Sequence, residues 1–267
     1  MRIFLLKLLT FAVFCGIIKS MKRKEKVKMF DFSQKILMID NETANSLDDP
    51  IVYDVGFEVF DLAGRIYERA SFINQDVFKD SELMATAYYA EKIPQYEQQI
   101  KKGESVLLPW CMIKWKIYDV CKQHNIKIVA AHNARFDSKS LNYTQRYITT
   151  SKYRYFLPKG IVWWDTLKMA RSVLGNNYDY RMFCLENNYV TANNQNRYTA
   201  EVIYRFLSGN NNFNEAHKGL DDVEIEKEIF RYCVVTNPEI DGRLFTKDYK
   251  PKTAWHRKWW DTGRASA

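Results

Sequence analysis

The sequence predicts an α/β fold with a mixed five-stranded sheet flanked by helices. Three consecutive segments (35–40, 52–60 and 65–73) are rich in apolar, β-branched and aromatic residues and predict neighbouring strands, with a hairpin-type turn at 61–64. Helical and strand-like patterns then alternate along the chain, as is typical of a sheet covered by helices. A chain of 267 residues is long enough for one such domain with terminal additions.

The elements after residue 80 follow from periodicity. The stretch 81–125 has a helical pattern and predicts a helical crossover, with one apolar face formed by Ile113, Ile117, Val120 and Cys121. Strands are then expected at 127–131 and 161–164, and helices at 135–147, 166–174, about 200–207 and 221–234. Asn-rich stretches at 193–196 and 209–212 are typical of loops.

Charge divides the chain into three parts. The formal net charge is +8, but residues 1–29 hold eight basic residues and one acidic residue, and residues 241–267 hold seven and three. The central part, 30–240, holds 25 basic and 28 acidic residues, so its net charge does not resemble that of a basic nucleic-acid-binding domain. We therefore expect an apolar and basic N-terminal segment (1–29), one domain (30–240), and a basic, Trp-rich tail (241–267).

The N-terminal segment allows three interpretations. Residues 3–18 are almost wholly apolar and precede a basic run, which fits a short membrane anchor that leaves the domain in the cytoplasm. A secretory signal fits less well, because no small-residue cleavage site follows. A start codon assigned too early is the third interpretation, since Met21 and Met29 precede the first strand.

Five widely spaced cysteines without a CxxC pair argue against a disulfide framework or a zinc site and favour a reducing compartment, the cytoplasm.

Two carboxylates end the first predicted strand. Side chains alternate along a strand, so Asp40 and Glu42 project from the same face and could hold a hard divalent cation together. An Asp-x-Glu pair alone is also compatible with a solvated turn. Asp137 lies where a strand gives way to a helix, where either metal binding or helix capping explains a carboxylate.

A histidine and a carboxylate near the end of the predicted domain complete the set of candidate catalytic residues. His217 lies on a predicted loop, five residues before Asp222, which opens a helix. The other histidines end a helix (His124), lie in the tail (His256) or fit a core position (His132). His217 is therefore the histidine with a context for proton transfer.

Three ordered segments resemble the exonuclease motifs of the DEDDh family of 3′–5′ exonucleases. They are Asp-Asn-Glu-Thr at 40–43, Asn133-x-x-Phe136-Asp137, and His217-x4-Asp222. The family includes the epsilon proofreading subunit of bacterial DNA polymerase III, RNase T, oligoribonuclease and phage exonucleases. The resemblance extends over roughly residues 34–235, and 164–167 resembles the family's strand-to-helix element. It implies an RNase H-like fold.

The resemblance also implies a two-metal phosphodiester hydrolysis. Asp40, Glu42, Asp137 and Asp222 would bind two Mg²⁺ or Mn²⁺ ions, and His217 would take the proton from the attacking water. The physical chemistry agrees, because four carboxylates at close range repel one another unless cations lie between them.

Further roles come from the same motif positions. Thr43, Asn133 and Phe136 would lie near the terminal nucleotide, although Phe136 also fits packed core. Asp222 is preferred over Asp221, because the family spacing is five and Asp221 suits a helix start.

The predicted activity is trimming of single-stranded DNA from the 3′ end. RNA trimming by a homologue of the same family is the alternative within the enzyme class, and a catalytically silent nucleic-acid-binding module is the alternative outside it. An association with replication machinery rests on analogy alone.

The tail mixes tryptophans with lysines and arginines, as single-strand binders do. The alternative interpretation is that its tryptophans pack on the domain.

Overall fold

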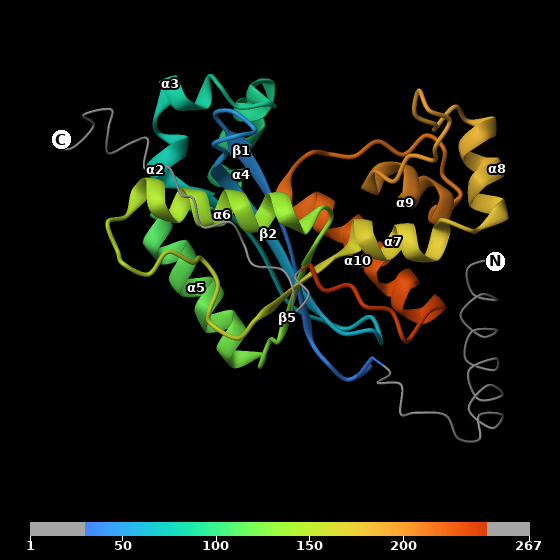
Figure 1. Cartoon of the computed structure of the whole chain (residues 1–267). Helices are drawn as coiled ribbons and strands as arrows, with labels where there is room; N and C mark the ends of the chain where they lie inside the picture. The colour runs from blue at the N-terminus through green and yellow to red at the C-terminus, as the bar shows by residue number, and fades with distance from the viewer. Residues whose placement is uncertain (1–29, 245–267) are drawn as a thin grey trace. The chain divides into compact units, whose positions relative to one another are not determined.

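A mixed six-stranded sheet forms the centre of the domain in the computed structural model, which describes residues 30–244 (Figure 1). The strand order is β4-β3-β2-β1-β5-β6, and β2 is antiparallel to both of its neighbours while the other pairs are parallel. The strands are β1 (Ile36–Ala44), β2 (Ile51–Phe60), β3 (Ile66–Asn74), β4 (Val106–Leu108), β5 (Ile128–Ala131) and β6 (Val162–Asp165).

The expectation of five strands was one too few, because the sequence pattern missed β4. This strand has only three residues and pairs with β3 at the edge of the sheet. Its partner residues lie more than thirty positions earlier in the chain, so the pairing is tertiary and leaves no local periodicity. The other five strands overlap the predicted segments, which confirms the mixed α/β class.

Helices connect the strands and cover both faces of the sheet. The structure confirms the predicted helices and adds two that the sequence patterns did not predict, the short α2 before residue 81 and α8. The helices are α2 (Gln75–Phe78), α3 (Ser81–Met84), the 3₁₀ helix η1 (Ala90–Lys92), α4 (Ile93–Lys102), α5 (Trp110–Gln123), α6 (Ala134–Ile148), α7 (Thr166–Leu174), α8 (Tyr178–Glu186), α9 (Ala200–Ser208) and α10 (Gly219–Thr236).

Alternation along β1 decides which side chains meet which helices. Leu37 and Ile39 face one way and pack in a core with residues of α5 and α6, among them Ile113 and Leu141. The intervening positions of β1 face α10, which packs against β1, β2 and α7 (Figure 1). Asp40 belongs to this second set, so the fold directs it toward α10.

Several expectations concern residues outside the described range. The N-terminal segment (1–29) lies outside it, as does the tail from 245 onward, and the proposed domain boundaries stay a prediction. Among the helices described between residues 30 and 244, none combines the length and apolarity that a membrane span requires. The described cysteines are free: Cys111, Cys121, Cys184 and Cys233.

Candidate active site

Asp40 and Glu42 lie on the face of β1 that meets the start of α10. Asp40 pairs with Gly56 of β2. A Cβ atom placed on Gly56 would lie 2.0 Å from the carbonyl carbon of Gly219, the first residue of α10. The missing side chain of Gly56 therefore allows α10 to begin directly beside the two carboxylates.

Asp54 fixes the start of α10 from β2. Its Oδ2 accepts hydrogen bonds from the Tyr96 hydroxyl (2.9 Å) and from the Gly219 amide (3.0 Å). Burial raises the pKa of Asp54 to about 6, while the Gly219, Tyr96 and Ser71 hydrogen bonds lower it. Asp54 pairs with Glu42 in the β1–β2 register, so the anchor of α10 lies next to the predicted site.

Asp222 lies in the first turn of α10 and is buried. Its two carboxylate oxygens accept the backbone amides of His217 (3.2 Å) and Lys218 (2.9 Å). Asp221 is exposed and does not line the cavity described below. The geometry therefore brings Asp222, and not Asp221, to the other acids.

Two groups of side chains could each hold a metal ion. Ligand atoms of Asp40, Glu42 and Asp222 all lie within 4.8 Å of one another, and so do those of Glu215, His217 and Asp222. The first group is all carboxylate, the donor type that Mg²⁺ and Mn²⁺ prefer. Asp222 belongs to both groups and is therefore the carboxylate that the two possible ligand sets have in common.

Asp137 stands at the edge of this cluster. It lies in the first turn of α6, is buried, and its Oδ1 accepts a hydrogen bond from the Asn41 side-chain amide at 2.7 Å. It belongs to neither three-residue group. Its charge nevertheless contributes to raising the pKa of Asp40, which shows that the two carboxylates interact.

Burial and mutual repulsion hold the acids partly protonated without a cation. Burial, and then the charges of Glu226, Asp137, Glu42 and Asp222, raise the pKa of Asp40 well above its ordinary range. Burial also raises the pKa values of Glu42 and Asp222, each to about 8. A divalent cation would offset the repulsion, so the donor set fits a metal site.

His217 lies on the loop before α10 with a left-handed backbone (φ 50°). Its ring stacks on Tyr89, with centroids 4.4 Å apart and planes at 13°. Lys92 donates hydrogen bonds to the carbonyls of Ala216 and His217 and so ties the loop to the crossover. Burial, and then the charge of Lys92, lower the pKa of His217, which keeps the imidazole neutral near pH 7.

Two acids of this region were missed by the sequence reading. Glu226 is buried, and its Oε2 accepts the His132 amide at 3.1 Å. It lies one helical turn after Asp222, a spacing that could have revealed it. Glu215 has an oxygen 4.0 Å from Nδ1 of His217, and burial raises its pKa to about 7.

A cavity of about 530 Å³ opens over the acids. Its lining includes Asp40, Glu42, Asp137, His217 and Asp222, the five predicted catalytic residues. Asn133 and Phe136 also line it, whereas Thr43, which lies after a β-bulge in β1, does not. The role of Thr43 at the terminal nucleotide therefore stays a prediction.

The opposite wall of the cavity is polar and basic. Arg171 of α7 and Arg197 and Tyr198 of the segment before α9 line it. The Arg171 guanidinium lies 5.8 Å from the centre of the Tyr198 ring. The sequence reading did not assign these residues, because only the tertiary fold brings this segment opposite β1.

The fold that carries this site is RNase H-like. Its sheet has antiparallel β2 between β3 and β1, parallel β5 and β6 beside β1, and helices on both faces, and a solved 3′-exonuclease shares this fold. No protein-family model matches the sequence, and no curated protein matches it.

Solved structures of exonucleases are similar to the chain in fold. A 3′-exonuclease bound to a histone mRNA stem-loop is 11% identical, with a TM-score of 0.55 over 78% of this chain and 85% of the other. Exonuclease X with a 5′-overhanging DNA duplex is 18% identical, with a TM-score of 0.42 over 76% and 92%. Exonuclease I of E. coli with a dT13 oligonucleotide is 14% identical, with a TM-score of 0.48 over 77% and 42%. The first of these supports the fold.

Proposed function

We propose that the protein is a metal-dependent 3′–5′ exonuclease of the DEDDh type that hydrolyses single-stranded DNA. The observation that carries this proposal is the convergence of Asp40, Glu42 and Asp222 within 4.8 Å, beside Asp137 and His217 in one cavity. These residues come from β1, α6 and the start of α10, so only the folded chain assembles them. The fold of a solved RNA 3′-exonuclease agrees with a nuclease role.

The proposed role of the buried carboxylates is to bind metal ions. Asp40, Glu42, Asp137 and Asp222 would hold two divalent cations, Mg²⁺ or Mn²⁺. When bound, such ions stabilise charge on the attacking and leaving oxygens of a phosphodiester. A silent binding module would gain nothing from burying these mutually repelling acids.

His217 acts as the general base. Its lowered pKa leaves the ring unprotonated at neutral pH and therefore able to accept a proton from water. Stacking on Tyr89 and the ties from Lys92 to the loop carbonyls fix the ring at the cavity edge. Restricting the ring in this way places the base without an ordering cost during the reaction.

Two sets of residues that line the cavity contact different parts of the substrate. Asn133 and Phe136 at the start of α6 contact the terminal nucleotide from the side of the acids. Arg171 and Arg197 on the opposite wall pair with phosphates, which the acidic wall alone would repel. The side chains thus supply both the positive charge that holds the strand and the negative charge that holds the cations.

A labelled-substrate assay tests the proposal. Single-stranded DNA with a 5′ label, and RNA of the same sequence, are incubated with the full chain and Mg²⁺, Mn²⁺ or EDTA. We expect a ladder that shortens from the 3′ end, requires the metal and is lost in Asp40→Asn. Faster shortening of the RNA would assign the exoribonuclease alternative, and absence of cleavage by folded wild type would favour the binding module.

A further inference from the structure

Positive charge is concentrated in one segment of the otherwise acidic domain. Residues 109–163 hold ten Lys and Arg but only two acids, Asp119 and Asp137, whereas 30–240 as a whole holds 25 basic and 28 acidic residues. Asp137 belongs to the proposed active site. Arg146 is buried, and the other nine basic residues leave the surface of this segment strongly basic, a property typical of contacts with nucleic-acid phosphates.

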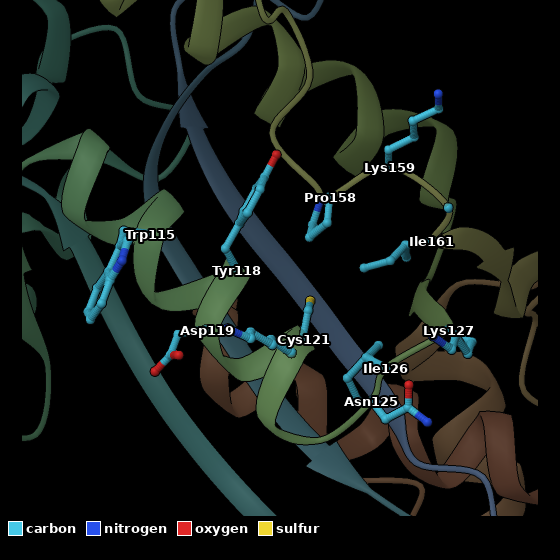
Figure 2. A pocket seen from close by; sticks show the side chains of 12 residues that line it. Trp115, Tyr118, Asp119, Cys121, Asn125, Ile126, Lys127, Pro158, Lys159 and Ile161 are labelled. Atoms are coloured by element: carbon cyan, nitrogen blue, oxygen red, sulfur yellow. The ribbon is translucent and has the colours of Figure 1, made fainter.

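A cavity of about 560 Å³ opens in this segment, between α5 and residues 158–161 (Figure 2). Figure 2 shows Tyr118 and Cys121 of α5 facing Pro158 and Ile161 across an apolar interior. The rim is basic, with the exposed residues Lys122, Lys127 and Lys159. An apolar interior with a cationic rim suits a nucleobase with its phosphate.

Asp119 is the one acidic residue in the described lining of this cavity. Asp119 accepts a hydrogen bond from the Gln123 side chain at 2.6 Å. Among the described residues, Asp119 makes no direct ion pair with Lys122, Lys127 or Lys159. The rim keeps its positive charge for a ligand.

Exposed aromatic rings line this cavity and a neighbouring one. Trp115 is 58% exposed, and Tyr153 and Tyr155 are 40% and 50% exposed. The two tyrosines line a second cavity of about 340 Å³ that shares residues 158–161 with the first. Exposed rings beside lysines are what a single strand needs, because bases stack on the rings and phosphates pair with the charges.

Helix α6 connects this region to the active site. The first cavity is lined by Lys127, just before β5, and by residues 158–161, just before β6. Asp137 of the active site lies in the first turn of α6, which follows β5. On α6, exposed Arg135 and Lys139 lie on the helix face that leads to Asn142 in the second cavity. Lys139 donates to the Leu47 carbonyl at 3.0 Å.

We propose that this basic and aromatic surface binds the upstream part of a single-stranded nucleic acid whose 3′ end lies in the active site. The surface is formed by Trp115, Lys122, Lys127, Tyr153, Tyr155 and Lys159. The proposal rests on the proposed function and adds a substrate-length preference to it. Short strands reach only the acids, whereas longer strands also reach the surface.

Binding measurements on two strand lengths test the proposal. Fluorescence anisotropy is measured with the full chain carrying Asp40→Asn, and with DNA of about 4 and about 24 nucleotides, which bracket the roughly 4–16-nucleotide sites of single-strand binders. The test variant adds Lys127→Glu and Lys159→Glu. The matched control adds Lys79→Glu and Lys101→Glu, which are exposed lysines outside the surface.

We expect the test variant to bind the long strand at least about 10-fold more weakly than the control does, with equal binding of the short strand. Two lost phosphate contacts should reduce the slope of log K against log salt by about 1.4. Trp115→Ala should weaken long-strand binding roughly 10-fold through lost stacking.

Equal long-strand affinity and salt slope in test and control variants would overturn the proposal. Cleavage separates this result from failure of the proposed function. With Asp40 intact, the lysine variants should degrade the short strand like wild type. If no variant cleaves but the lysines still govern long-strand binding, the nuclease proposal fails and the binding surface stands.

Discussion

Gly56 of β2 and Gly219 of α10 approach so closely that neither has room for a side chain. A Cβ at Gly219 would lie 2.6 Å from the amide nitrogen of Gly56 and 3.0 Å from the carbonyl oxygen of Asp40. This contact sets the start of α10 against β1, and Asp222 follows within the same helical turn. The geometry of the site therefore depends on Gly56 and Gly219, which have no side chain that could take part in the proposed reaction.

Gly56→Ala should disrupt the site and destabilise the domain. The added methyl group meets backbone atoms, which cannot rotate away, so we expect a loss of at least about 3 kcal/mol in the free energy of unfolding. Gly160→Ala is the control, because nothing lies within 4 Å of its Cβ and only its left-handed backbone (φ +93°) costs about 1–2 kcal/mol. Equal losses in urea unfolding would contradict the proposed packing.

Neutralising one acid should separate activity from stability. Burial and neighbouring carboxylates raise the pKa of Glu42 to about 8, so the metal-free fold must either bury this charge or take up a proton. Glu42→Gln removes that cost, so the metal-free variant should melt at a higher temperature than wild type. Cleavage should fall about 10²–10³-fold, because electrostatic stabilisation of the transition state is lost. A metal-free melting temperature equal to or below that of wild type would show that the acids do not repel one another in the fold.

The stability of the metal-free protein should fall as pH rises from about 5 to 8. Glu42 and Asp222 have ordinary pKa values of 4.5 and 3.8, and the fold raises both to about 8. In this window the folded state binds more protons than the unfolded state, so each carboxyl costs about 1.4 kcal/mol of stability per pH unit. Thermal melts in EDTA should show this decline, and Mg²⁺ should remove most of it. Stability that rises through the window in EDTA would refute the assignment.

His217→Gln should lower kcat about 10²–10⁴-fold, the usual contribution of a general base, with a smaller effect on KM. Because the pKa of His217 lies below its ordinary 6.5, the wild-type rate should decline only at pH values below that point. The variant should lack this acidic decline. His124→Gln is the control, since His124 pairs with Glu68 at 3.0 Å and does not line the cavity. An unchanged pH profile in His217→Gln would assign the proton transfer to another group.

Local patterns in the sequence predicted the elements that carry the acids. Alternation placed Asp40 and Glu42 on one face, and the change from strand to helix placed Asp137 at the start of α6. The spacing of Glu226, one helical turn after Asp222, places it on the same face of α10, but the local pattern does not distinguish a buried glutamate from a solvated one. The wall formed by Arg171 and Arg197 depends on how α7 and the segment before α9 pack, which no local pattern encodes.

The most direct test of the account is the stoichiometry of Mn²⁺ binding, measured by calorimetry on the full chain. We predict two ions per chain in wild type and in Asp221→Asn, and loss of at least one ion in Asp222→Asn, because Asp222 is a proposed ligand whose carboxylate lies within 4.8 Å of the ligand atoms of Asp40 and Glu42. Asp221 and Asp222 are adjacent and carry the same charge, so a general electrostatic effect would change both variants alike. Equal binding by Asp222→Asn and Asp221→Asn, or no binding by wild type, would contradict the account.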